Sequence, residues 1–442
     1  SELGAHWWLQ NKSGIDELLD TDFSLLSQDR VYRVSDKLLS CRDELEEYLS
    51  GKERTLFNLQ ETVILYDLTN TFFEGTAKYN SKAKFGRSKE KRYDCPLLTL
   101  GLVLDGDGFS KRSRVFEGNV SEPQTLAKIL EGLNKQPSLL KPLVIMDAGI
   151  ATDDNLKWLK DNQYDYLAVS RRKKREIPQD VLSRMTAVKH DSQDKELVTA
   201  ALVNNADNQE FEVWCHSISK EKKEEGIHNL SRQRFEDGLK KIESGLTKKN
   251  GTKLYRKVVE RIGRLKERYS RMTRHFEINI EKDDKDVVTA LFWKWKEDTE
   301  NTNGVYCLRT NRQGLDEQRL WDLYNLIRDV EDAFRCMKSD LGLRPVRHHN
   351  EQRADGHLFI TVLAYHILHA IRFKLRKKDI HDSWSTIRER LSLHIRTTTT
   401  LKKKDNKAIH IRKTSRPESY QKLIYQALGI AEVPGRTVKN MF

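Results

Sequence analysis

The sequence predicts an α/β fold built on a mixed sheet. Residues 64–66 and 143–146 form short apolar runs with the length and composition of buried strands, and each run stops at an aspartate, Asp67 or Asp147. Other segments repeat apolar residues at helical spacing. Because strands that form hairpins come before alternating helix and strand patterns, a mixed sheet is favoured over a doubly wound parallel one.

The composition favours a polyanionic partner. The 442 residues are enough for two or three domains, and 79 Lys and Arg against 66 Asp and Glu give a net charge of +13. Such an excess suits nucleic acid or an anionic membrane surface. The cysteines form no Cys-x2-Cys pair, which argues against a zinc ribbon or a disulfide framework and favours a reducing, cytoplasmic location.

Neither the N-terminal sequence nor the apolar runs indicate a membrane partner. No signal peptide pattern is visible at the N-terminus. The longest apolar run, 358–371, contains His366 and His369 and is too short to span a bilayer, so it predicts a buried helix. The chain starts at Ser1 without an initiator Met, which leaves open whether it is truncated.

Residues 1–58 are predicted to be helical. Val31, Val34 and Leu38 recur at helical spacing. This segment could be a shortened DNA-binding or dimerisation module, but a helix pair that packs on the rest of the chain is the favoured interpretation.

Residues 59–172 are predicted to form the first part of the core. Strands are expected at 62–68, 97–104 and 109–115, and the Asp-Gly-Asp-Gly sequence at 105–108 is expected to be a hairpin turn rather than a calcium loop. A helix (125–133), the strand before Asp147, a helix capped near Thr152 and a strand (166–170) follow. This order predicts a mixed sheet of the ribonuclease H type.

Residues 173–302 are predicted to be an inserted α+β domain. After a basic run at 171–175, the expected elements are a strand (211–218), two charged helices (220–246 and 254–269) and two strands (276–280 and 287–295). Trp293 and Trp295 share one strand face, where packing is favoured over stacking on a displaced base.

Residues 303–375 are predicted to complete the core, with a strand at 304–310, one long helix and the buried helix. The long helix carries an apolar stripe formed by Leu320, Leu323, Ile327, Val330, Phe334 and Met337. Residues 376–442 are predicted to be a basic accessory segment with strands near 392–401 and 407–411.

The long helix supplies a candidate third acid. Tyr324, Glu331 and Lys338 are seven residues apart, which is about 700° of rotation, so they line up along one helix face. Arg328 and Arg335 flank this line. A ladder of salt bridges on a solvated face is the competing interpretation.

If Asp67, Asp147 and Glu331 converge, their oxygens could hold two Mg²⁺ ions, for which Mn²⁺ could substitute. Two such ions promote an in-line phosphoryl displacement. Lys338, Arg328 and Arg335 would then contact phosphate groups.

Several motifs, in order, resemble those of DDE-type insertion-sequence transposases. The third acid of one subgroup lies in a Tyr-x2-Arg-x3-Glu-x6-Lys signature, which here is Tyr324-x2-Ile327-x3-Glu331-x6-Lys338, with Ile327 in place of the Arg. The other matching motifs are Tyr66-Asp67-Leu68-Thr69, Phe116-Glu117-Gly118-Asn119 and Met146-Asp147-Ala148-Gly149. The similarity runs from about residue 62 to 374.

This resemblance implies a ribonuclease H-like core with an insertion, and cut-and-paste transposition in the nucleoid of a prokaryotic cell. It implies double-stranded DNA as partner, both the terminal inverted repeats of the element and the target, and a homodimer in the synaptic complex. Relatives also carry a Gly-x-Ser-Lys element like that at 86–89, which favours DNA contacts by Arg87 and Lys89 over a merely solvated basic loop.

Two alternatives differ in class. A haloacid-dehalogenase-like phosphatase would use an Asp-x-Asp pair, but Thr69 stands at the second position. A catalytically inactive, DNA-binding descendant of a transposase is the non-enzyme alternative, which the departure at Ile327 keeps open.

Overall fold

A computed structural model describes residues 2–59, 63–131, 133, 142–171, 176–205, 210–296, 302–402, 408–433, 435 and 437–441. The chain divides into two compact units, the first made of Ser1–Tyr166 with Asn325–Phe442 and the second of Leu167–Tyr324. Most of the basic run at 171–175 and the expected strand start at residue 62 lie outside the described residues.

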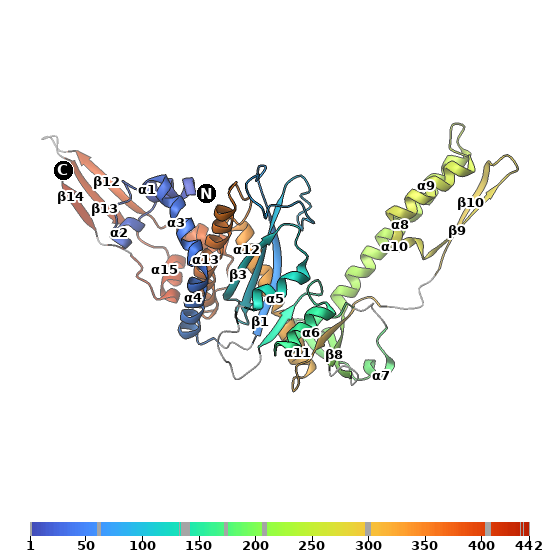
Figure 1. The fold of residues 1–442 in the computed structure, drawn as a ribbon, viewed down its shortest axis with the longest axis horizontal. Coiled ribbons are helices and arrows are strands. Elements are labelled where there is room, and N and C mark those ends of the chain that lie inside the picture. Colours follow the sequence, from blue (N-terminus) through green and yellow to red (C-terminus); the bar gives the residue numbers. More distant parts are fainter. Residues whose placement is uncertain are drawn as a thin grey trace. The chain divides into compact units, whose positions relative to one another are not determined.

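The first unit holds the N-terminal helices, part of a sheet and the C-terminal elements (Figure 1). Its elements are α1 (Glu2–Asn11), α2 (Ile15–Leu19), α3 (Gln28–Ser40), α4 (Arg42–Phe57), β1 (Val63–Phe72), β2 (Leu97–Asp105), β3 (Ser110–Glu117), the 3₁₀ helix η1 (Glu122–Thr125), α5 (Leu126–Leu130), β4 (Leu143–Met146), α6 (Asp153–Asp161), α12 (Ile327–Ser339), α13 (Glu351–Arg376), α14 (Trp384–Ser392), β12 (Arg396–Lys402), β13 (Ala408–Thr414), α15 (Ser419–Leu428) and β14 (Val438–Met441). β5 (Asp165–Val169) crosses the boundary between the units.

The remaining elements belong to the second unit, apart from the last residue of α11. They are α7 (Gln179–Leu182), β6 (Thr186–His190), β7 (Glu196–Asn205), β8 (Glu210–Ser217), α8 (Ile218–Thr247), α9 (Tyr255–Arg268), α10 (Ser270–Thr273), β9 (Phe276–Lys282), β10 (Val288–Trp295), β11 (Val305–Thr310) and α11 (Glu317–Asn325).

The predicted mixed sheet is confirmed. Nine strands follow the order β3-β2-β1-β4-β5-β11-β8-β7-β6. β1 pairs with β2 antiparallel and with β4 parallel. Every residue of β2 and of β4 is buried, as expected for strands in the interior of a sheet that is covered on both faces. This arrangement is consistent with the ribonuclease H-like fold.

The hairpin between β2 and β3 confirms the turn expected at 105–108. One carboxylate oxygen of Asp105 accepts hydrogen bonds from the backbone N–H groups of Asp107 (3.0 Å) and Phe109 (2.9 Å). Local bonds of this kind are typical of an aspartate that starts a turn.

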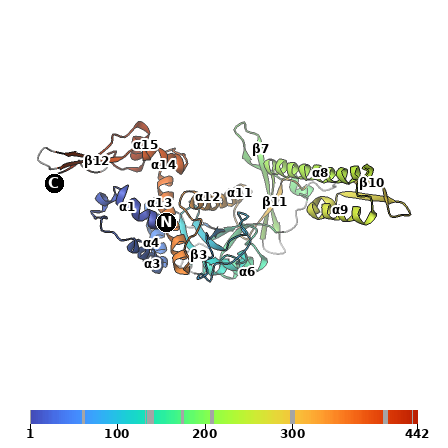
Figure 2. The same cartoon turned by 90° about the horizontal axis from the view of Figure 1, so that it is seen from above.

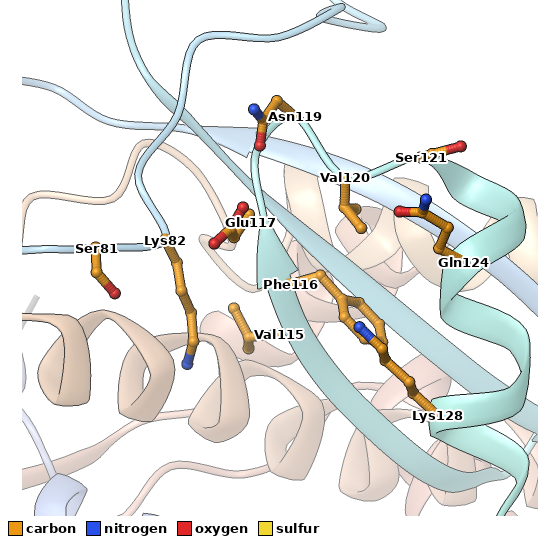
Figure 3. Close-up of a pocket in the computed structure, with 10 residues that line it drawn as sticks. All are labelled: Ser81, Lys82, Val115, Phe116, Glu117, Asn119, Val120, Ser121, Gln124 and Lys128. Carbon is orange, nitrogen blue, oxygen red and sulfur yellow. The ribbon is translucent and has the colours of Figure 1, made fainter.

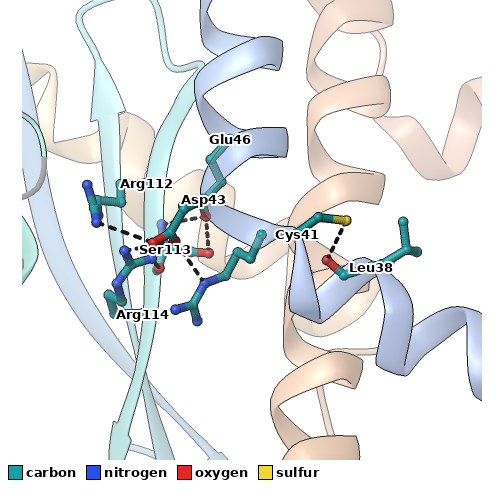
Figure 4. Close-up of polar contacts among 8 residues, drawn as sticks. Leu38, Cys41, Asp43, Glu46, Arg112, Ser113 and Arg114 are labelled. Atoms are coloured by element: carbon teal, nitrogen blue, oxygen red, sulfur yellow. Dashed lines mark hydrogen bonds and ion pairs between the residues drawn. The ribbon is translucent and has the colours of Figure 1, made fainter.

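The N-terminal helices are confirmed, and they pack on the rest of the first unit. α3 lies against α13, and α4 lies against β3 (Figure 2). Figure 4 shows the polar contacts of α4 with β3: Glu46 accepts from Ser113 N–H at 2.8 Å, and Asp43 lies 3.0 Å from the Arg114 guanidinium. Burial raises the pKa of Glu46, although Ser113 and Arg114 oppose the shift. These helices therefore pack on the first unit, and a DNA-binding or dimerisation role of this segment stays a prediction.

The predicted buried helix is confirmed, but it is longer than expected. α13 has 26 residues and is long and apolar enough, by length and composition alone, to cross a membrane. Its buried side chains pack within the first unit, and His366 Nδ1 lies 2.7 Å from the Glu53 carboxylate of α4. Burial lowers the pKa of His369 to about 4, so this imidazole stays neutral at pH 7. The apolar composition of α13 is therefore that of a helix in the core.

Two expected helices differ from those observed. Within the described residues, the segment at 125–133 forms only the short α5, directly after η1. The single long helix is interrupted, because α11 ends at Asn325 and α12 begins at Ile327. Asn325 is a weak helix former, and the Asp329 N–H bonds to the Leu326 carbonyl at 2.9 Å to start the second helix. The apolar stripe continues on α12, where Val330, Phe334 and Met337 are buried.

In the second unit, α8 lies beside α9 and β10 (Figure 2). The predicted strands and the two charged helices of this region are confirmed. Trp293 packs against the buried residues of α8, α9 and β10, and Trp295 packs against Phe276. The packing interpretation of the two tryptophans is therefore confirmed.

The basic C-terminal segment forms a three-stranded sheet in the order β12-β13-β14, which confirms its two predicted strands. Two arginines of this sheet reach α2: Arg412 lies 3.1 Å from Asp16, and Arg396 lies 2.6 Å from Glu17.

Candidate active site

Parallel pairing brings Asp67 and Asp147 to neighbouring positions. In the β1–β4 register Tyr66 stands opposite Met146, so the next residue on each side is an aspartate. Asp147 follows β4 directly, as predicted. Asp67 was expected at the end of its strand and instead lies inside β1. The strand continues because its pairing with β2 extends five residues further, to Phe72 opposite Leu97.

The Asp67 carboxylate is largely buried and close to other charges. Its side chain is 16% exposed, and Oδ1 accepts the Leu68 N–H at 2.7 Å. The pKa of Asp67 is raised to about 6, chiefly by burial and further by the negative charges of Asp147 and Glu122. The ammonium of Lys89 opposes this shift. The two aspartates are thus close enough to repel each other electrostatically.

Asp147 lies in a tight turn that fixes its carboxylate. Oδ1 accepts the Gly149 N–H at 3.0 Å, and the Asp147 carbonyl accepts the Ile150 N–H at 3.1 Å. Asn155 holds this turn from α6, because its side-chain amide donates to the carbonyls of Ile150 (2.8 Å) and Pro123 (2.9 Å). Asn155 therefore joins the turn of Asp147 to η1.

Glu122 is an acid near this pair that the sequence reasoning missed. It begins η1, and its carbonyl accepts the Thr125 hydroxyl at 2.6 Å, while Tyr66 on β1 donates to the same hydroxyl. A Cβ atom at Gly149 would lie 2.4 Å from Glu122 Oε2, so the absence of a side chain there leaves room for this carboxylate. The Gly-Asn-x-x-Glu pattern that follows β3 was the available signal.

Lys89 lies among these acids. Its ammonium donates to the Leu68 carbonyl at 2.7 Å and lies 3.9 Å from Asp67 Oδ1 and 3.7 Å from Glu122 Oε1. The loop of residues 85–92 that carries it passes close to the end of β3. A Cβ atom at Gly86 would lie 2.5 Å from the Gly118 carbonyl oxygen, which explains the glycine in this motif.

The structure does not join Glu331 to the two aspartates. Glu331 is exposed on α12, the helix that packs on β1. In the part of the chain that the structure describes, no three His, Cys, Asp or Glu side chains are grouped closely enough to hold one metal ion. The third carboxylate of the expected set therefore stays a prediction.

Lys338 contacts the loop of Lys89. Its ammonium lies 2.9 Å from Glu90 Oε1, and Arg344 forms a second ion pair with the same oxygen. Lys338 is only 14% exposed. It thus holds the loop of residues 85–92 against the end of α12.

The other predicted DNA contacts differ in their surroundings. Arg87 and Arg328 are exposed. Arg335 is exposed and forms an ion pair with Asp332, one turn earlier on α12. Tyr324 belongs to the second unit and lies on α11, whereas Glu331 lies on α12, so the two residues do not share one unbroken helix.

A hollow of about 620 Å³ lies in the first unit (Figure 3). Ten residues line it: Ser81, Lys82, Val115, Phe116, Glu117, Asn119, Val120, Ser121, Gln124 and Lys128. Neither Asp67 nor Asp147 is among them, so the candidate chemistry lies at the aspartates rather than in this hollow.

The donor set around Asp67 suits a hard divalent cation. The groups are carboxylate oxygens, which Mg²⁺ and Mn²⁺ prefer, and they already attract one positive charge, the Lys89 ammonium. Asp67 and Asp147 could each supply one oxygen ligand, and further ligands would come from Glu122, Glu331 or water.

The comparison with protein families identifies a matching family. The family model described as "Transposase DDE domain" matches residues 58–367, well over half of the chain. The matched range includes Asp67, Asp147 and Glu331. No curated protein matches the sequence.

Proposed function

The chain belongs to the transposase DDE domain family. We therefore propose that it is a DNA transposase that uses Asp67, Asp147 and Glu331 to cleave and join DNA strands. The reaction is cut-and-paste movement of an insertion sequence, and its substrates are the terminal inverted repeats of that element and the target DNA. The enzyme acts on DNA in the cytoplasm, as a homodimer that holds both ends.

One observation carries this proposal. Asp67 on β1 and Asp147 directly after β4 each follow the paired residues Tyr66 and Met146, inside the segment that matches the family. Two neighbouring carboxylates that repel each other favour a bound cation, because the cation offsets their charge.

Each chain residue has a separate task in this proposal. Asp67 and Asp147 bind the cations, and the backbone N–H groups of Leu68 and Gly149 hold their carboxylates in place. Glu331 completes the set from α12. Two Mg²⁺ or Mn²⁺ ions, when bound, activate a water or 3′-hydroxyl group and stabilise the leaving oxygen of the phosphodiester.

The basic residues position the DNA backbone. Arg87 and Arg328 are exposed and available for phosphate groups. Arg335 can exchange its exposed pair with Asp332 for a phosphate at little cost, since such surface pairs contribute about 0–1 kcal/mol. Tyr324 and Lys338 remain in the proposed DNA-binding set.

The proposed domains keep the expected boundaries, which differ from the division into compact units after Tyr166 and after Tyr324. Residues 59–172 and 303–375 form the catalytic core, 173–302 an insertion, 1–58 an N-terminal helical segment and 376–442 an accessory segment.

The experiment is cleavage of the element's own terminal DNA by the full chain, with Mg²⁺, with Mn²⁺ and with a chelator. We expect metal-dependent nicking that Glu331→Gln abolishes. Glu389→Gln, which changes an exposed glutamate on α14, should cleave like the wild type. Equal cleavage by both variants would remove Glu331 from the site.

The alternative is an inactive, DNA-binding descendant. The observation that favours it is the exposed position of Glu331, outside any three-donor group of the described residues. This alternative expects salt-sensitive binding of terminal DNA and no nicking with either metal.

A further inference from the structure

Lys89 has a position that phosphate binding does not explain. Its ammonium points into the protein, 2.7 Å from the Leu68 carbonyl and 3.7–3.9 Å from oxygens of Glu122 and Asp67. Binding of a DNA phosphate by Lys89 would not require these contacts. The ammonium instead occupies the space between two carboxylates, as a small cation would.

The backbone of Glu122 is held at this point by the surrounding structure. The Thr125 hydroxyl bonds to its carbonyl, and Gly149 leaves the space that Oε2 fills. Asn155 ties the chain next to Glu122 to the turn of Asp147. Glu122 and Asp147 are therefore positioned together, on opposite sides of Gly149.

The loop of Lys89 is anchored independently of Lys89 itself. Glu90 pairs with Lys338 and Arg344, and the buried Ser88 accepts the Glu90 N–H at 3.1 Å. The backbone can thus stay in place while the lysine side chain, which is 44% exposed, swings outward.

From these contacts we propose that Lys89 is a removable counter-cation of the carboxylate pair Asp67 and Glu122, the two groups that flank its ammonium. This inference rests on the proposed function. The ammonium offsets the negative charge while the divalent ions are absent, and it leaves when they enter, because two cations a few ångströms apart repel each other. Once displaced, the ammonium is free to contact DNA phosphate, which links loading of the site to engagement of the substrate.

The test is Mn²⁺ affinity of the full chain without DNA, measured from the paramagnetic resonance signal of free Mn²⁺. Lys89→Met should bind Mn²⁺ at least about tenfold more tightly than the wild type, since the competing charge is removed. Lys89→Arg keeps the charge and should stay near the wild-type affinity. A gain of affinity is not a result that misfolding produces.

Two further variants make the test specific. Lys282→Met removes a lysine of similar exposure that pairs with Asp286 in the second unit, and it should not change the affinity. Glu122→Gln should bind Mn²⁺ more weakly, whereas Glu131→Gln, at an exposed glutamate nearby, should bind like the wild type.

The outcomes separate this inference from the proposed function. Wild-type binding that Asp147→Asn weakens, together with unchanged affinity in Lys89→Met, would overturn the counter-cation role alone. Unchanged affinity in Glu122→Gln would remove Glu122 from the site. No Mn²⁺ binding by any variant would overturn both the inference and the proposed metal-dependent reaction.

Discussion

At the scale of single residues, Asn155 is the support on which the acid site depends. Its amide donates two hydrogen bonds, one to the turn that follows Asp147 and one to Pro123, next to Glu122. Without this amide the two carbonyls would each lose one hydrogen bond, although the Ile150 carbonyl would keep the Thr152 N–H at 2.8 Å. A shift of a few tenths of an ångström at either acid would disturb a site that needs fixed geometry.

We predict that Asn155→Ala lowers DNA cleavage strongly and costs about 1–3 kcal/mol of folding stability, since each of the two lost hydrogen bonds contributes about 0.5–1.5 kcal/mol. Asn162→Ala is the matched control, because that amide donates only to a carbonyl of its own helix, Trp158 at 2.9 Å. Cleavage assays and urea unfolding measure the two effects. Equal cleavage by both variants would show that Asn155 does not position the acids.

Part of this site could be predicted from single residues. The stop of each apolar run at Asp67 or Asp147 is visible in the sequence, and parallel pairing of the two strands brings the residues together. The role of Glu122 could not be predicted. It depends on the space that Gly149 leaves by lacking a side chain, and Gly149 is remote from Glu122 in sequence. The contacts of Lys89 likewise depend on how its loop folds back on β1.

At the scale of elements, the loop of residues 85–92 is fixed at both ends. Glu90 is bound by Lys338 and Arg344, and Gly86 lies against the backbone of Gly118. The approach at Gly86 is too close for any side chain, since a Cβ atom would lie 2.5 Å from a backbone oxygen that cannot rotate away.

We predict that Gly86→Ala destabilises the protein by about 1–3 kcal/mol, the usual cost of overpacking, and displaces Lys89. Gly51→Ala on α4 is the control, since nothing lies within 4 Å of its added Cβ atom. That change should stabilise the protein by about 0.5–1 kcal/mol, because glycine is unfavourable within a helix. Thermal unfolding distinguishes the two, and equal midpoints would contradict the close approach.

Most elements could be predicted from periodicity, but some of their ends could not. The apolar stripe from Leu320 to Met337 is continuous in sequence, so it conceals the break at Leu326. β1 extends past Asp67 because β2 provides partners up to Leu97, and pairing of that kind is not encoded within β1 itself. The extension of β1 comes from tertiary pairing that overrides local pattern, whereas the break at Leu326 follows a weak helix former, Asn325.

At the scale of the whole molecule, the charge of +13 predicts affinity for DNA that falls steeply with salt. Sequence gives this property directly, because net charge does not depend on the fold. It does not say which of the 79 basic residues contact DNA, since many of them are engaged in ion pairs, as Lys338 is with Glu90.

We predict that Arg87→Ala weakens binding to all DNA sequences about equally and lowers the salt slope by about one, as expected for a single phosphate contact. Arg264→Ala, which removes an exposed arginine paired with Glu260 on α9, should leave the slope unchanged. Binding titrations at several salt concentrations give both slopes. An unchanged salt slope in Arg87→Ala would show that Arg87 makes no phosphate contact and that the loop of residues 85–92 is merely solvated.

The most direct test of the whole account measures binding and cleavage of terminal DNA in the same samples, with Mn²⁺, for Asp147→Asn and for the control Asp154→Asn on α6. We expect Asp147→Asn to bind DNA with nearly wild-type affinity and to cleave none, because affinity comes mainly from phosphate contacts while cleavage needs the paired carboxylates. Asp154→Asn should bind and cleave like the wild type. Cleavage by Asp147→Asn at the wild-type rate would contradict the assignment of Asp67 and Asp147 as the active site.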